Sequence, residues 1–267
     1  TLYLLPPDRL DGPTYLALVV ALSVTTWPLL FLWASVVGVS LAGGVVWAVI
    51  AALALLGLYG VWSRRGRRLI QPPGKGRDLL PDVALVFVLL LVVGTRVLQV
   101  RELVVPAWVD SVHHTVLAQL LSKMGMVPSS CEPYLAVSDF HYHFGFHASA
   151  AVLMWLSGLP SYRAVLILGQ VFNAMTALSL YALASWLTKE RWAGVGAALV
   201  GGLLSNMPAY YVSWGRYTQL TGLMLLPLIC LVTVWLLDEG ADKGASNPGL
   251  LAIGALLLAG LGVIHYR

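Results

Sequence analysis

The chain of 267 residues is 59% hydrophobic and only 10% charged, and its formal net charge is +4 at pH 7. Its mean hydropathy of +0.82 lies far above that of an ordinary soluble domain, so the composition excludes a water-soluble globular protein. The apolar residues form runs near the roughly 20 residues that a helix needs to cross a bilayer. We therefore predict an integral membrane protein of the all-α class, a polytopic bundle of about 7–8 transmembrane helices.

In this interpretation a single transmembrane domain covers residues 1–267. Because the chain starts at Thr1 and stops at Arg267 soon after an apolar run, we expect it to be a piece of a longer protein. A missing carboxy-terminal domain, or partner subunits, would then contribute to its function.

The first charge-poor stretch is too long for one span and predicts two, near 14–36 and 42–62. The segment that follows, Ser63 to Asp78, is basic and contains Arg64, Arg65, Arg67, Arg68, Lys75 and Arg77. We interpret it as a cytoplasmic loop under the positive-inside rule, and we expect no nucleic-acid binding. The next span, near 82–100, then runs outward and places residues 101–144 on the extracytoplasmic side.

Five of the six histidines fall between residues 113 and 147, and most of them lie in this long polar segment. The stretch from Asp110 to Met124 has the pattern of an amphipathic juxtamembrane helix, on which Asp110 lies one turn from His113 and His114. Such a carboxylate can act as a general base, or can bind a divalent cation together with imidazoles. It can equally be an N-terminal helix charge that the helix dipole favours, and both alternatives stay open.

A second polar group alternates with aromatic residues in the sequence Asp139-Phe-His141-Tyr-His143-Phe-Gly-Phe-His147. We expect His141 and His143 to position a phosphate or a metal ion together with His113 and His114. The candidate metal ligands are Asp110, His114 and His143, for Mg²⁺, Mn²⁺ or Zn²⁺. The alternative is an aromatic belt at the membrane interface.

Five apolar runs complete the chain, near 145–159, 164–187, 192–208, 219–237 and 249–264. The first is the shortest, and it either lies along the interface or crosses the membrane. An interfacial 145–159 places Lys189 and Arg191 inside and the loop 210–219 outside, whereas a spanning one inverts both. We favour the interfacial arrangement because it satisfies the positive-inside rule twice.

Two arginines follow apolar runs, Arg216 in the sequence Trp214-Gly-Arg-Tyr217 and Arg267 in His265-Tyr-Arg267. Each could bind a phosphate through forked hydrogen bonds or extend to the interface without a specific ligand. In the interfacial arrangement both lie on the same side as Asp110. A carboxylate, imidazoles and two arginines on one face suit a lipid-phosphate substrate.

The sequence resembles the amino-terminal core of GT-C class membrane glycosyltransferases, which include oligosaccharyltransferase-like and mannosyltransferase-like proteins. The resemblance rests on Trp108-Val-Asp110-Ser-Val-His-His, a helix ending at Gly125, the aromatic-His entry into the next apolar segment, Tyr162-Arg163-Ala, and Trp214-Gly-Arg-Tyr. It covers residues 82–267, with the two spans of 14–62 as an addition. It implies that Asp110 is the catalytic base or a metal ligand and that the donor is a polyprenyl-phosphate-linked sugar.

We therefore expect a glycosyltransferase of the cell envelope, embedded in a prokaryotic plasma membrane, that transfers a sugar to an acceptor on the extracytoplasmic face. Asp110 would be catalytic, and His113, His114, His141, His143, Arg216 and Arg267 would bind the substrate phosphate. Membrane lipids and the lipid-linked donor are the expected partners. The alternatives are a transporter, for which Arg96 and Asn173 are the main polar candidates within spans, and a non-catalytic subunit of a membrane complex.

Overall fold

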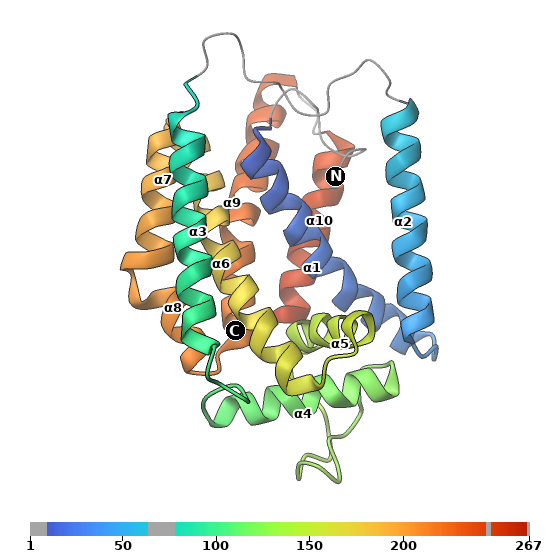
Figure 1. Cartoon of the computed structure of the whole chain (residues 1–267). Coiled ribbons are helices and arrows are strands. Elements are labelled where there is room, and N and C mark those ends of the chain that lie inside the picture. The colour runs from blue at the N-terminus through green and yellow to red at the C-terminus, as the bar shows by residue number, and fades with distance from the viewer. Residues whose placement is uncertain (1–9, 64–77, 244–246, 266–267) are drawn as a thin grey trace.

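The structure, a computed structural model, describes residues 10–63, 78–243 and 247–265. The regular secondary structure in these ranges is helical, without a strand (Figure 1). The elements are α1 (Gly12–Val36), α2 (Gly43–Ser63), α3 (Leu80–Val100), α4 (Val109–Met124), α5 (Gly145–Ser157), α6 (Ser161–Thr188), α7 (Arg191–Leu199), the π-helical turn η1 (Val200–Leu204), α8 (Asn206–Ser213), α9 (Tyr217–Lys243) and α10 (Pro248–Ile264).

Six helices of the described chain are long and apolar enough to cross a membrane. They are α1, α2, α3, α6, α9 and the continuous stretch Arg191–Ser213, which contains α7, η1 and α8. Two apolar helices are shorter, α5 with 13 residues and α10 with 17. The all-helical class and the membrane character that the sequence predicts are thereby confirmed.

Two helices lie across one end of the bundle instead of along it. Figure 1 shows α4 and α5 at the lower end, transverse to the long helices. The chain leaves α3 and enters α6 at this same end, which is the arrangement that an interfacial 145–159 requires. We call this end of the bundle the α4 end, and the end at which α6 is followed by α7 the opposite end.

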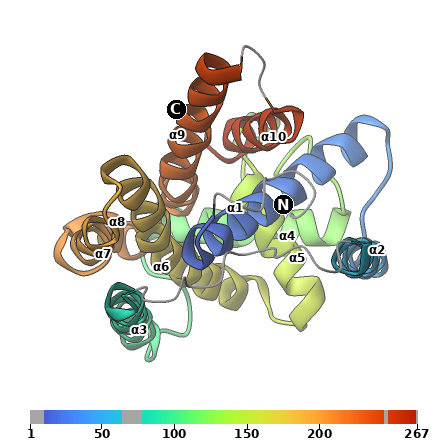
Figure 2. The same ribbon diagram turned by 90° about the horizontal axis from the view of Figure 1, so that it is seen from above.

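The first two helices differ in how they join the bundle. α1 packs against α10, α5 and α6 and buries Leu18 and Phe31 completely, whereas α2 packs mainly against α5. Figure 2 shows α2 standing apart from the remaining long helices. α1 is therefore an integral part of the core, although the sequence suggested one addition made of both spans.

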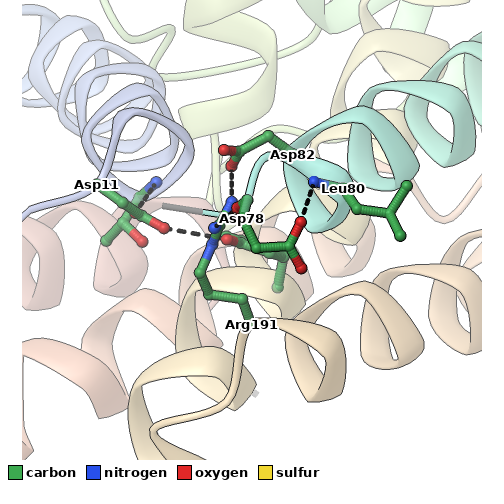
Figure 3. Close-up of polar contacts among 7 residues, drawn as sticks. Asp11, Asp78, Leu80, Asp82 and Arg191 are labelled. Carbon is green, nitrogen blue, oxygen red and sulfur yellow. Dashed lines mark hydrogen bonds and ion pairs between the residues drawn. The ribbon is translucent and has the colours of Figure 1, made fainter. Parts of the chain in front are cut away.

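At the opposite end a polar network ties four helices together (Figure 3). Arg191, at the start of α7, forms an ion pair with Asp82 of α3, and its Nη1 donates to the main-chain carbonyl of Asp78 over 2.8 Å. Tyr181 of α6 donates to Asp11, the N-cap of α1, over 3.0 Å. We call these five residues the Arg191 clamp. The basic residues predicted between Ser63 and Asp78 lie outside the described residues.

Two polar residues within the spans, Arg96 and Asn173, bind main-chain carbonyls. Arg96 of α3 donates through Nη2 to the carbonyl of Gly202 in η1 over 2.6 Å, and Asn173 of α6 donates to the carbonyl of Pro208 over 3.0 Å. Both acceptors belong to the interrupted stretch Arg191–Ser213. These contacts tie α3 and α6 to that stretch.

Candidate functional site

A pocket of about 670 Å³ opens at the α4 end. Its walls are the amino-terminal half of α4, the segment 131–142 and the side chain of Arg216. Asp110, His113 and His114 contribute from α4, and the loop adds polar and apolar groups in turn. Titratable side chains and an apolar wall thus face one cavity, which is typical of a ligand site.

The turn after α4 fixes this helix against the rest of the protein. Gly125 ends α4 in the left-handed region with φ 66°, and its carbonyl accepts from the Leu41 amide over 2.7 Å. A Cβ at Gly125 would collide with the Leu41 backbone, so only glycine permits this close approach. Asp110 lies in the first turn of α4, where the helix dipole stabilises a carboxylate.

Asp110 forms an ion pair with Arg216, which belongs to the turn between α8 and α9. The Arg216 Nε lies 3.5 Å from the Asp110 Oδ2, and the side chains are 44% and 36% exposed respectively. The guanidinium carbon of Arg216 also lies 4.6 Å from the centre of the Trp214 ring. Trp214 therefore makes a cation–π contact with the guanidinium, while Asp110 contacts it at Nε.

The backbone around Arg216 is held by its two neighbours. Gly215 has φ 71°, and an added Cβ would lie 2.7 Å from the Ser111 hydroxyl, so the turn packs directly on α4. Tyr217 is completely buried and stacks on Phe146 with ring centroids 5.1 Å apart. The position of Arg216 is thus set by packing on both sides and does not depend on its ion pair.

Two buried histidines join α4 to α5 beneath the pocket. The Nδ1 of His114 and the Nε2 of His147 lie 2.7 Å apart, within hydrogen-bonding distance. Burial lowers the pKa of His114 to about 4 and the pKa of His147 well below its ordinary value. Both rings are therefore neutral at pH 7, so that one nitrogen of the contact donates and the other accepts.

The structure brings most of the predicted site residues together. Asp110, His113, His114, His141 and Arg216 all line the pocket. His143 instead turns inward, is buried, and bonds through Nε2 to the Thr218 hydroxyl over 2.9 Å. Arg267 lies outside the described residues.

The predicted metal ligands do not assemble into a metal site. Asp110 pairs with Arg216, His114 with His147, and His143 with Thr218, so the three side chains are directed to different partners. Over the described ranges no group of three or more His, Cys, Asp or Glu side chains is placed to hold a metal ion. The geometry therefore does not fit the Mg²⁺, Mn²⁺ or Zn²⁺ centre expected from the sequence.

Several important residues were not among the candidates. Gly215, Tyr217 and Trp214 position Arg216, and His147 completes the buried pair. The signal for the first three is the sequence Trp-Gly-Arg-Tyr itself, in which a glycine and two aromatic residues surround one charge. His147 stands out in the sequence as a member of the histidine cluster, but its pairing with His114 does not, because that partner lies on another helix.

Comparison with known proteins finds one family. No curated protein and no solved structure matches the chain. A family model matches residues 8–266, a region that includes α1 and α2 together with every element of the pocket. The chain therefore belongs to the family described as a family of unknown function, DUF6541.

Proposed function

We propose that the protein is a membrane glycosyltransferase that moves a sugar from a polyprenyl-phosphate-linked donor to an acceptor on the extracytoplasmic face. The observation that carries this proposal is the pairing of Asp110 with Arg216 at a pocket between α4 and the loop 131–142. A carboxylate and a guanidinium at one cavity supply the base and the phosphate ligand that such a transfer needs. The resemblance of residues 82–267 to GT-C enzymes points to the same chemistry.

In the proposed reaction the acceptor hydroxyl oxygen attacks the anomeric carbon of the donor sugar. The bond between that carbon and the phosphate oxygen breaks, and the phosphate leaves with the bonding electron pair. Asp110 takes the proton of the acceptor hydroxyl, and Arg216 offsets the charge that develops on the phosphate. His113 and His141 line the same pocket and donate hydrogen bonds to hydroxyl or phosphate oxygens.

We further propose seven membrane spans, with α10 as the seventh and with α4 and α5 at the interface. The basic segment 63–78 connects α2 to α3 in the sequence, Lys189 follows α6, and Arg191 is the first residue of α7. Helices α2 and α6 end, and α3 and α7 begin, at the opposite end of the bundle, so the positive-inside rule assigns that end to the cytoplasm. Residues 101–144 and the pocket then face outward, in a prokaryotic plasma membrane.

The wall of the pocket also supports a lipid-linked donor. Leu117, Leu135, Val137 and Phe140 face the cavity beside the charged groups. A site that combines an apolar wall with an arginine suits an amphipathic substrate whose phosphate lies at the boundary between its polar and apolar parts. The transmembrane helices keep such a lipid near the pocket.

The proposal is tested by assaying sugar transfer with purified protein, polyprenyl-phosphate sugars and hydroxyl acceptors. We expect Asp110→Asn to lower the rate by about 100-fold or more, because loss of a general base typically costs that much. The matched control is Glu102→Gln, which removes an exposed carboxylate that pairs with Arg101 before α4. Full activity of Asp110→Asn would refute the proposed role of Asp110.

A further inference from the structure

Arg216 has more donors than its protein partners use. A guanidinium carries five N–H groups, and the ion pair with Asp110 engages Nε only. Among the described residues, Nη1 and Nη2 have no hydrogen-bonding partner, although Arg216 lines the pocket. The guanidinium carbon lies 4.6 Å from the centre of the Trp214 ring, and the N–H donors of a guanidinium point outward in its own plane.

The contact between Asp110 and Arg216 is loose. At 3.5 Å through a single nitrogen it lacks the two parallel short bonds of a strong arginine–carboxylate pair. Both side chains are more than one-third exposed, and pairs of this kind contribute little net stability. A competing anion could therefore displace the carboxylate at small cost.

We propose that Arg216 and Trp214 form a subsite for a lipid phosphate group, and that Asp110 occupies this subsite as an internal counterion until the phosphate replaces it. This inference rests on the proposed function, which it deepens by adding the exchange of Asp110 for the phosphate at Arg216. A phosphate presents several oxygens to the planar edge of a guanidinium, whereas Asp110 reaches only Nε. The fixed backbone at Gly215 and Tyr217 keeps the subsite in place while the partners exchange.

The exchange would order the events in the pocket. When the phosphate binds Arg216, the Asp110 carboxylate loses its counterion. It can then accept the proton of an acceptor hydroxyl. Donor binding would therefore precede productive acceptor binding. The apolar wall at Leu117, Val137 and Phe140 would hold the first part of the lipid chain.

The test measures binding without any turnover. Purified protein in detergent is titrated with farnesyl phosphate, with farnesol and with inorganic phosphate, and the quenching of tryptophan fluorescence is followed. We expect farnesyl phosphate to bind at least 10-fold more tightly than either of the other two compounds, since it alone carries both the phosphate and the apolar chain. Equal binding of farnesol would overturn the phosphate subsite, and equal binding of inorganic phosphate would overturn the lipid assignment.

The variants test the competition directly. Asp110→Asn removes the internal counterion and should tighten farnesyl phosphate binding by about 2-fold, which corresponds to the contribution of an exposed ion pair. Arg216→Gln should weaken binding at least 10-fold, and Arg216→Lys, which keeps the charge without the fork, should lie between. Glu102→Gln should bind as the wild type does.

Two outcomes decide the inference. If Asp110→Asn binds farnesyl phosphate no more tightly than the wild type, Asp110 does not compete for the subsite and the inference is wrong. The second outcome compares the double variant Asp110→Asn/Arg216→Gln with Arg216→Gln alone. If the double variant still binds farnesyl phosphate more tightly, the effect of Asp110→Asn does not act through Arg216, which also overturns the inference. Because no sugar is transferred in this assay, failure of the glycosyltransferase proposal would show separately, as binding without activity.

Discussion

The two ends of the bundle each contain an arginine paired with an aspartate, and the two pairs differ in how they are embedded. At the opposite end Arg191 binds both the Asp82 carboxylate and the Asp78 carbonyl, and the paired side chains are only 25% and 30% exposed. At the α4 end Arg216 touches Asp110 through one nitrogen, at 44% and 36% exposure. The same two residue types thus form a structural clamp at one end and, at the other, an exposed ion pair that a ligand can displace.

The difference follows from what holds the backbone at each end. At the opposite end the polar side chains themselves link α1, α3, α6 and α7 (Figure 3). At the α4 end, Gly215 and Tyr217 fix the turn by packing, so the charged side chains need not contribute to stability. An arginine that is not required for folding can be used for binding.

The largest effect is expected from breaking the packing at the α4 end. Tyr217→Ala should lower the free energy of unfolding by about 3–5 kcal/mol, because it removes a completely buried ring that stacks on Phe146. The measurement is thermal or denaturant unfolding in one detergent, followed by tryptophan fluorescence. Tyr217→Phe, which keeps the ring, is the control, and a loss below about 1 kcal/mol would contradict the anchoring role.

The second prediction concerns pH. Burial lowers the pKa of His114 to about 4, below the 6.5 of an exposed histidine, so the unfolded chain binds a proton more readily than the folded protein does. Stability should therefore be complete above about pH 6.5 and decline toward pH 4, by on the order of 3 kcal/mol. His147 shifts in the same direction.

Unfolding curves between pH 7.5 and pH 4 check this expectation. The decline should be smaller in His114→Gln, whose amide does not titrate, and unchanged in His113→Gln, which replaces the neighbouring histidine outside the buried pair. An equal decline in His114→Gln would show that the acid sensitivity arises elsewhere.

The third prediction compares the two ion pairs by parallel double-mutant cycles. We expect a coupling of about 1–2 kcal/mol between Arg191 and Asp82, since both are mostly buried, and below about 0.5 kcal/mol between Arg216 and Asp110. The cycles use Arg→Gln and Asp→Asn, with unfolding as the readout. Equal coupling energies would show that the Arg191–Asp82 pair stabilises the fold no more than the Arg216–Asp110 pair does.

The smallest effect should come from a third pair of this kind. Arg101 and Glu102 pair at the α4 end with side chains 61% and 81% exposed. Glu102→Gln should change stability by less than about 0.5 kcal/mol and leave farnesyl phosphate binding unchanged. A larger effect on binding would extend the candidate site beyond the pocket.

Most of the helices could be predicted from hydropathy alone, because a long apolar run with polar flanks predicts a transmembrane helix and its approximate ends. The spans predicted near 14–36 and 82–100 correspond to α1 and α3. The span predicted at 192–208 is instead interrupted by η1 and continues through α8 to Ser213. A π-helical turn changes hydrogen bonding without changing hydropathy, so the pattern of apolar residues does not reveal it.

The candidate site was predicted less completely, for a physical reason. Asp110 and Arg216 could be found as charges beside apolar runs, and the shared side followed from the interfacial arrangement of 145–159. The pairing of His114 with His147 depends on how α4 packs against α5, which no local pattern encodes. The expected metal ligands are separated for the same reason, because Asp110 pairs with Arg216, His114 with His147 of α5, and His143, which precedes α5, with Thr218.

The contact between Arg96 and η1 shows how two unfavourable features can cancel one another. A buried guanidinium without a carboxylate is costly in hydrocarbon, and so is a widened helical turn whose carbonyls face no water. Here the guanidinium meets the Gly202 carbonyl at 2.6 Å, so each provides the polar environment that the membrane withholds from the other. The Arg96 Nη1 also donates to the Gln99 side chain over 3.5 Å, so loss of the π-helical turn would remove one of two partners of Arg96, whereas loss of Arg96 would remove this contact from the Gly202 carbonyl.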